Sequence, residues 1–226
     1  MNKPWRYLIL LLAGVGAWAQ ESVAGPAADE ALAKLMAGNQ RYVRHQEQRP
    51  NQSLARRKEL GAGQHPFAVI LGCADSRVSP ELLFDQGLGD LYVIRVAGNI
   101  LNDAVLGSIE YAVEHFGTKL VMVLGHEKCG AVSAAVEGSI AAGHFKALVA
   151  AIQPSVEASR KEPGDRIHNC VIANARRVAK QVRESEPILK DEVEKHGVKV
   201  VAANYDLDSG KVNLLDAGRP LAATST

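Results

Sequence analysis

Short runs of apolar residues recur along the chain and are separated by longer amphipathic segments. Residues 67–71 and 120–124 contain no polar side chain, a pattern typical of strands that are buried on both faces of a sheet. Three further strands are predicted at residues 91–96, 198–203 and 211–215. The last two flank the turn sequence Asp208-Ser209-Gly210, which predicts an antiparallel hairpin.

Helix-start and helix-stop signals lie between these strands. Asn102 predicts the start of a helix that ends at Gly117, and Asp165 predicts the N-cap of a longer helix that runs to about residue 185. Ser79-Pro80 predicts a short helix, because proline is favoured at the first helical position. Two more helices are predicted at residues 130–137 and 187–196.

An N-terminal helical arm, about residues 29–60, precedes the first strand and carries no evident chemistry. Residues 29–48 have helical spacing with Asp29 as the predicted N-cap, and Gly38-Asn39 is expected to divide them into two helical pieces. Residues 53–60 predict a short basic helix. We expect this arm to pack against a neighbouring part of the chain or a second subunit.

Alternation of strands and helices predicts an α/β fold. We expect a central, mostly parallel sheet of about four parallel strands plus an antiparallel edge strand, flanked by helices and extended by the N-terminal helical arm. Residues 20–226 are predicted to form a single domain. Sheets of this kind bind ligands beyond the carboxyl ends of their strands.

The first nineteen residues have the pattern of a secretory signal peptide. Lys3 and Arg6 precede a short apolar run at residues 7–15, and Ala17-Trp18-Ala19 matches a cleavage site. The run is short for a membrane span, which favours cleavage over a signal anchor. We therefore predict export to the periplasm, removal of residues 1–19 and no stable membrane association afterwards.

Composition narrows the classes of partner. Hydrophobic residues make up 47% of the chain and charged residues 23%, which is ordinary for a globular domain. The formal net charge is +1, and no basic stripe alternates with aromatic residues, so we expect no nucleic-acid partner.

Two short segments concentrate the candidate chemistry, and each directly follows one of the fully apolar strands. They are Gly72-Cys73-Ala74-Asp75-Ser76-Arg77 and Gly125-His126-Glu127-Lys128-Cys129-Gly130. Thiolate and imidazole are the ligands that zinc prefers. The sequence therefore predicts one Zn²⁺ per chain if the two strands are neighbours.

The sequence does not decide whether water or Asp75 is the fourth ligand of such a zinc ion. Three protein ligands plus water permit catalysis, whereas four protein ligands make a structural site. A bidentate pair between Asp75 and Arg77 would hold the carboxylate away from the metal and keep it ionised.

The three cysteines allow a second interpretation in an oxidising compartment, namely a Cys73–Cys129 disulfide. That interpretation leaves Asp75, Arg77 and His126 without a role. Cys170 lies at helical spacing among apolar residues, which favours a place in the core.

Cys73-x-Asp75-Ser76-Arg77 followed by His126-x-x-Cys129-Gly130 resembles the signature of the β-class carbonic anhydrases. The likeness extends from about residue 29 to 215 and includes several other motifs: Gly38-Asn39-x-Arg41-Tyr42, Arg95-x-Ala97-Gly98-Asn99, Ser108-Ile109-Glu110-Tyr111-Ala112 and Tyr205-Asp206…Gly210. The resemblance implies a lyase that reversibly hydrates CO₂ to bicarbonate and a proton by attack of zinc-bound hydroxide. It also implies a homodimer with intertwined N-terminal helices, or a homotetramer.

The resemblance further implies roles for individual residues. Cys73, His126 and Cys129 would ligate zinc. Asp75 would be a catalytic residue paired with Arg77, or a fourth ligand in an inactive state. The residues implied to bind substrate are Gln64 through its amide, Tyr92 and Tyr111 as pocket walls, the latter from a second subunit, and Gly130 through its backbone N–H.

One departure from the family bears on regulation. Some members bind bicarbonate in a pocket that needs a tryptophan three residues before the first cysteine, and here that position is Ile70. We therefore expect a site that is open at neutral pH. The sequence leaves three alternative functions open: hydrolysis of carbon disulfide or carbonyl sulfide at the same site, zinc binding without catalysis, and disulfide redox chemistry.

Overall fold

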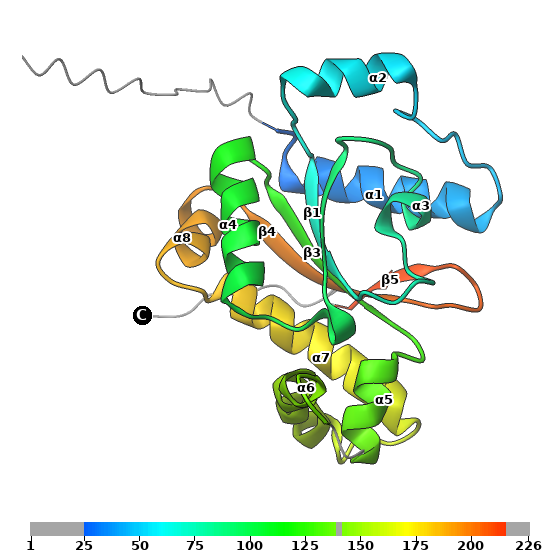
Figure 1. Ribbon diagram of the computed structural model, residues 1–226, viewed down its shortest axis with the longest axis vertical. Coiled ribbons are helices and arrows are strands. Elements are labelled where there is room, and N and C mark those ends of the chain that lie inside the picture. The colour runs from blue at the N-terminus through cyan, green and yellow to red at the C-terminus, as the bar shows by residue number, and fades with distance from the viewer. Residues whose placement is uncertain (1–24, 139–141, 216–226) are drawn as a thin grey trace, which may run out of the picture.

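Five strands form one sheet in the computed structural model, which describes residues 25–138 and 142–215 (Figure 1). The strands are β1 (Ala68–Gly72), β2 (Leu91–Arg95), β3 (Leu120–His126), β4 (Lys199–Tyr205) and β5 (Val212–Leu214). Their order is β2-β1-β3-β4-β5. All neighbours are parallel except β4 and β5, which pair antiparallel. The predicted α/β fold class is confirmed, and β1 and β3 are neighbours.

Eight α-helices and two short 3₁₀ segments precede or connect the strands within the described residues. The helices are α1 (Ala28–Val43), α2 (Leu54–Glu59), α3 (Pro80–Leu83), α4 (Asp103–Phe116), α5 (Gly130–Glu137), α6 (Phe145–Ser159), α7 (Arg166–Arg183) and α8 (Ile188–Lys195). The 3₁₀ segments are η1 (Leu60–Ala62) and η2 (Ala97–Asn99). No helix in the described part of the chain is both long and apolar enough to cross a membrane.

Alternate side chains of β1 and β3 point to opposite faces of the sheet, so the apolar runs of these strands supply two cores. Val69 and Val121 face a cluster closed by α4, α7 and α8. Ile70 and Met122 face a second cluster closed by α1 and α3. A third cluster lies among η2, α5, α6 and the start of α7 (Figure 1), and it contains Cys73, Cys129 and Cys170.

Several predicted helix caps are confirmed by hydrogen bonds. The Asn102 side chain accepts from Val105 N, and Asp165 accepts from His168 N. Gly117 ends α4 in the left-handed conformation, at φ 64°, which glycine adopts without a Cβ penalty.

The prediction of two N-terminal helical pieces was wrong. Helix α1 runs without interruption through Gly38 and Asn39 and ends at Val43. A Cβ at position 38 would lie 1.8 Å from the carbonyl oxygen of Phe84, so Gly38 permits close packing rather than a break. Asn39 joins distant segments, because its amide donates to Leu83 O and its Oδ1 accepts from Val212 N.

Asp29 was also wrongly predicted as the N-cap. The cap position is Ala27, which offers no side-chain hydrogen bond, and Asp29 lies in the first turn. Its negative charge there still favours the helix, because the N-terminal end of the helix dipole is positive.

Helix α6 was not among the predicted elements. It contains Pro154, a residue that disfavours helix interiors. Two of its four buried residues are serines, Ser155 and Ser159, which weakens the apolar periodicity. The predicted signal peptide, residues 1–19, lies outside the described residues.

Candidate metal centre

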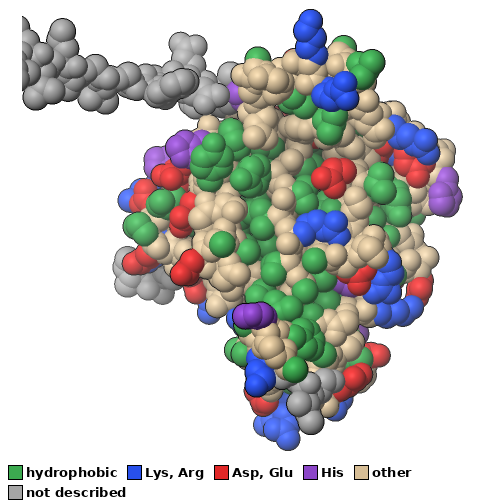
Figure 2. All heavy atoms as spheres, in the orientation of Figure 1, with side chains coloured by type: hydrophobic (Ala, Val, Ile, Leu, Met, Phe, Trp, Pro, Cys, Tyr) green, Lys and Arg blue, Asp and Glu red, His purple; other side chains and the backbone are tan. Residues whose placement is uncertain are grey.

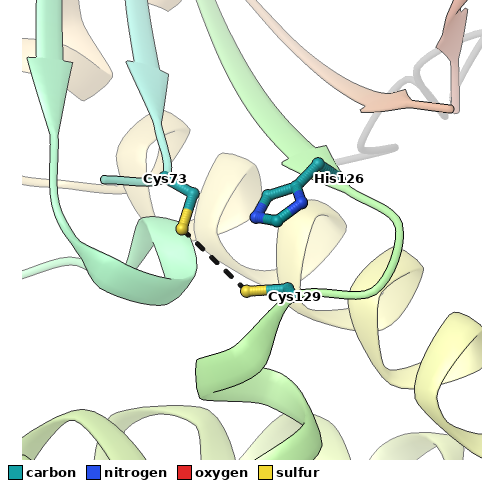
Figure 3. Close-up of side chains that lie close together, drawn as sticks. All are labelled: Cys73, His126 and Cys129. Atoms are coloured by element: carbon teal, nitrogen blue, oxygen red, sulfur yellow. Dashed lines mark hydrogen bonds between the residues drawn. The ribbon is translucent and has the colours of Figure 1, made fainter. Parts of the chain in front are cut away.

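The parallel pairing of β1 with β3 brings the two predicted segments together. Gly72 pairs with Leu124, so Cys73 emerges next to the end of β3. Cys73 follows β1, His126 is the last residue of β3 and Cys129 directly precedes α5 (Figure 3). The ligand atoms of the three side chains all lie within 4.8 Å of one another, and all three residues are buried.

The two cysteines are free. Their sulfurs are 3.9 Å apart, whereas a disulfide requires about 2.05 Å. The contact with the Cys129 sulfur lowers the pKa of Cys73. The same contact and burial raise the pKa of Cys129.

His126 provides the best test of whether a metal fits here. Its Nδ1 is 2.8 Å from the carbonyl oxygen of Glu127, and a carbonyl only accepts, so Nδ1 carries the proton. Nε2 is left with a lone pair, buried and without a hydrogen-bond partner in the described chain. Buried polar atoms are seldom left unpaired, and an imidazole nitrogen beside two sulfurs is a donor set that zinc prefers.

Asp75 and Arg77 adopt the bidentate arrangement that the sequence left open. Arg77 Nε donates to Asp75 Oδ1 at 2.9 Å, and Arg77 Nη2 donates to Oδ2 at 2.7 Å. These hydrogen bonds hold the pKa of Asp75 well below its usual range. Asp75 Oδ2 also lies 3.9 Å from His126 Nε2, so an ionised carboxylate borders the candidate metal position.

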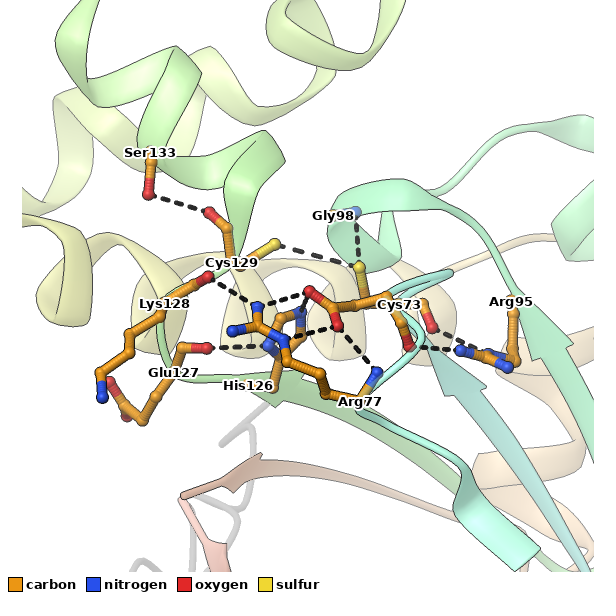
Figure 4. A network of polar contacts seen from close by, with 10 residues as sticks. Cys73, Arg77, Arg95, Gly98, His126, Glu127, Lys128, Cys129 and Ser133 are labelled. Carbon is orange, nitrogen blue, oxygen red and sulfur yellow. Dashed lines mark hydrogen bonds and ion pairs between the residues drawn. The ribbon is translucent and has the colours of Figure 1, made fainter. Parts of the chain in front are cut away.

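Arg77 links the two segments, and Arg95 holds the backbone of the first (Figure 4). Arg77 Nη2 donates to the carbonyl of Lys128 at 3.2 Å, which links the first segment to the second. Arg95, at the end of β2, donates from Nε to the carbonyl of Cys73 at 2.9 Å and from Nη2 to that of Asp75.

We expect Arg95→Ala to loosen the Cys73–Asp75 backbone. Charged hydrogen bonds of this kind each contribute about 1.5–3 kcal/mol when protected from water, so a loss of about 1–2 kcal/mol in the free energy of unfolding is expected at this partly exposed position. Urea unfolding of the variant and the parent measures it. An unchanged unfolding midpoint would show that these bonds do not stabilise the segment.

Four other predicted site residues lie outside the Cys73–His126–Cys129 cluster. Gly130 is the first residue of α5, exposed and adjacent to Cys129. Gln64 is exposed in the segment before β1. Tyr92, on β2, packs against Phe116, with ring centroids 5.9 Å apart. Tyr111, on α4, is 47% exposed.

Among the described residues of this single chain, Gln64, Tyr92 and Tyr111 form no hydrogen bond to the cluster. Their substrate-binding roles therefore remain predictions, as does that of Gly130.

Glu127 and its neighbours form a contact set that sequence reasoning missed. Glu127 Oε1 accepts from Asn204 Nδ2 and lies 2.9 Å from His168 Nδ1, while Glu127 N donates to Tyr205 O. These contacts hold the residue whose carbonyl orients His126. The partners come from β4 and α7, so no local spacing could have identified them.

A family model and two similar proteins all point to carbonic anhydrase. A family model described as carbonic anhydrase matches residues 68–212. Carbonic anhydrase 2 of Mycobacterium tuberculosis is 39% identical over 186 residues, covering 80% of this chain and 90% of that protein. A carbonic anhydrase of Mycolicibacterium smegmatis is 38% identical over 184 residues, covering 80% and 89%.

Solved structures extend the likeness to the fold. The β-carbonic anhydrase CafA of Aspergillus fumigatus aligns with a TM-score of 0.64 at 27% identity, covering 85% of this chain and 92% of that one. A tetrameric β-carbonic anhydrase of Sordaria macrospora aligns with a TM-score of 0.68 at 23% identity, covering 72% and 87%; at that identity the match supports the fold alone.

Proposed function

Because this chain belongs to the β-carbonic anhydrase family, we propose that Cys73, His126 and Cys129 hold the one zinc ion at which it works. The chain is an enzyme for the reversible hydration of carbon dioxide to bicarbonate and a proton. The observation that carries the zinc proposal is the set of three donor atoms within 4.8 Å of one another, one of them the unpaired His126 Nε2.

A zinc ion at this position supplies a Lewis acid that lowers the pKa of water to about 7, so that hydroxide is available at neutral pH. The residues of the chain then position the reactants. Asp75, kept ionised by Arg77, accepts a hydrogen bond from the reacting water and orients it towards the carbon of CO₂. In the net reaction a C–O bond forms and the water's proton leaves to solvent.

Carbon dioxide hydration by the chain from Gln20 onwards, measured by stopped flow together with zinc content, tests this proposal. We expect about one zinc per chain and rapid hydration. Full zinc content with hydration at the uncatalysed rate would contradict it. Turnover of carbonyl sulfide or carbon disulfide in place of CO₂ would contradict it as well.

We also propose that the site is open at neutral pH, with Asp75 bound to Arg77 instead of the metal. Two observations support this: the bidentate Asp75–Arg77 pair and Ile70, which is fully buried in the core cluster beneath α1 and α3. We expect bicarbonate to inhibit only weakly. A zinc–carboxylate bond to Asp75 in crystals grown at or above about pH 7.5 would contradict an open resting state.

A homodimer or homotetramer is proposed for the assembly. Hydrophobic side chains form a band over the middle of the face in Figure 2, and Tyr111 and Leu82 are among the large apolar side chains exposed by more than a third. Exposed apolar surface of this kind marks interaction sites. Light scattering should give a multiple of the chain mass, and a particle of 24.2 kDa or less would contradict the proposal.

Export to the periplasm is the remaining proposal about the whole chain, and it rests on the pattern of residues 1–19. N-terminal sequencing of the protein recovered from a periplasmic extract should begin at Gln20. An intact Met1 on a cytoplasmic protein would contradict it.

A further inference from the structure

The sulfur of Cys73 accepts a hydrogen bond from a turn that lies outside both predicted segments. Gly98 N donates to Cys73 Sγ at 3.3 Å (Figure 4). Gly98 belongs to η2 and has φ 71°, a left-handed conformation that favours glycine. The direction of this N–H therefore depends on what holds the turn in place.

The carbonyl of Gly98 is held by Asn174, from the middle of α7. Asn174 Nδ2 donates to Gly98 O at 2.8 Å, and Asn174 is only 1% exposed. The turn also presses against α6, since a Cβ at position 98 would lie 2.7 Å from Ile152 Cδ1. Asn99 Nδ2, in the same turn, has no hydrogen-bond partner among the described residues.

The orientation of the Asn174 amide is fixed from its other side. Ser155 Oγ and Arg177 Nη2 both donate to Asn174 Oδ1, each at 3.2 Å. Arg177 also donates to Ser155 Oγ at 2.7 Å and to Ala151 O at 2.6 Å. Because Oδ1 faces donors, Nδ2 must face the Gly98 carbonyl, and the amide cannot rotate without losing these bonds.

We propose that Asn174 is a positioning residue for the metal centre: by holding the Gly98 carbonyl, it aims the Gly98 N–H at the sulfur of Cys73. A hydrogen bond to a metal-bound thiolate withdraws charge from the sulfur and leaves the metal a stronger Lewis acid. This matters in a site with two thiolates, which donate more charge than imidazoles. The inference rests on the proposed zinc site.

The variant Asn174→Asp in the chain from Gln20 onwards tests this role. The carboxylate keeps an acceptor for Ser155 and Arg177 but removes the donor to Gly98 O. We expect the zinc dissociation constant, measured by chelator competition, to rise about 10-fold or more. In the Co²⁺-substituted protein we expect the sulfur-to-cobalt charge-transfer band to move to lower energy, because the thiolate loses its hydrogen bond.

Val178→Ala is the matched control. Val178 is buried in the same helix but lies in the cluster closed by α4, α7 and α8, away from η2. Val178→Ala should lower the unfolding temperature but leave the sulfur-to-cobalt charge-transfer band and the zinc dissociation constant unchanged. If Asn174→Asp behaves in the same way, Asn174 is merely structural and the positioning role is overturned.

Two further results keep the test decisive. If Asn174→Asp does not fold, Asn174→Ala replaces it, since it also removes the donor to Gly98 O; a normal charge-transfer band in that variant also overturns the proposal. A parent chain that binds neither Zn²⁺ nor Co²⁺ overturns the proposed metal site itself. Binding by the parent with unchanged variants overturns only the role of Asn174.

Discussion

We expect His126→Ala to lose bound zinc and carbon dioxide hydration together. The variant removes the nitrogen that completes the three-donor set, and two sulfurs alone do not make the tetrahedral site that zinc prefers. Without the metal, the pKa of the reacting water rises from about 7 to that of bulk water, so hydration should fall at least about 1,000-fold. Zinc content and stopped-flow hydration measure the two effects.

Cys170→Ala is the control for this loss. Cys170 is the third buried cysteine and lies in the same core cluster as Cys73 and Cys129, and burial raises its pKa, so that it remains a neutral thiol. That variant should keep its zinc and its activity. If His126→Ala kept a full complement of zinc, or Cys170→Ala lost it, the ligand assignment would be wrong.

Arg77→Ala should have the second largest effect, and it should separate zinc binding from catalysis. The three donor atoms are untouched, so zinc is retained. Asp75 loses both side-chain hydrogen bonds from Arg77 and becomes free to approach the metal position or to rotate away. Loss of a preorganised electrostatic group of this kind lowers turnover about 100- to 1,000-fold.

The pH dependence of the Asp75–Arg77 pair has a definite sign. Hydrogen bonds from Arg77 lower the pKa of Asp75, so the stability that the pair contributes is present above about pH 4. It is lost as the pH falls towards the lowered pKa. The free energy of unfolding should therefore fall less steeply with decreasing pH in Arg77→Ala than in the parent. Unfolding followed by circular dichroism at a series of acidic pH values measures this.

Arg160→Ala is a suitable control for Arg77→Ala. Arg160 makes an exposed ion pair with Glu157, 3.9 Å long, at the end of α6, and such pairs contribute little. Its hydration rate should match that of the parent. Full activity in Arg77→Ala would remove the Asp75–Arg77 pair from the mechanism.

Much of the architecture could be predicted because its causes are local. The apolar runs of β1 and β3 indicated strands buried on both faces, and Asn102 and Asp165 were identified as caps because each bonds an N–H three residues further along. Helix α6 and the continuity of α1 could not be predicted in this way. In both, tertiary contacts override a local signal: Pro154 in α6, and Gly38 in α1, whose missing side chain makes room for Phe84.

The amino-acid sequence by itself determined which donors this protein carries and where they lie relative to its strands. Two thiols, an imidazole and an Asp-x-Arg pair at two strand ends were enough to predict zinc and the family. Only the tertiary structure decided that β1 and β3 are neighbours, that His126 Nε2 is buried without a partner and that Asp75 is bound by Arg77. It alone placed Gly98 and Asn174 behind Cys73. The reason is physical: donor chemistry belongs to single residues, whereas distance, burial and hydrogen bonding arise between segments that meet only when the chain folds.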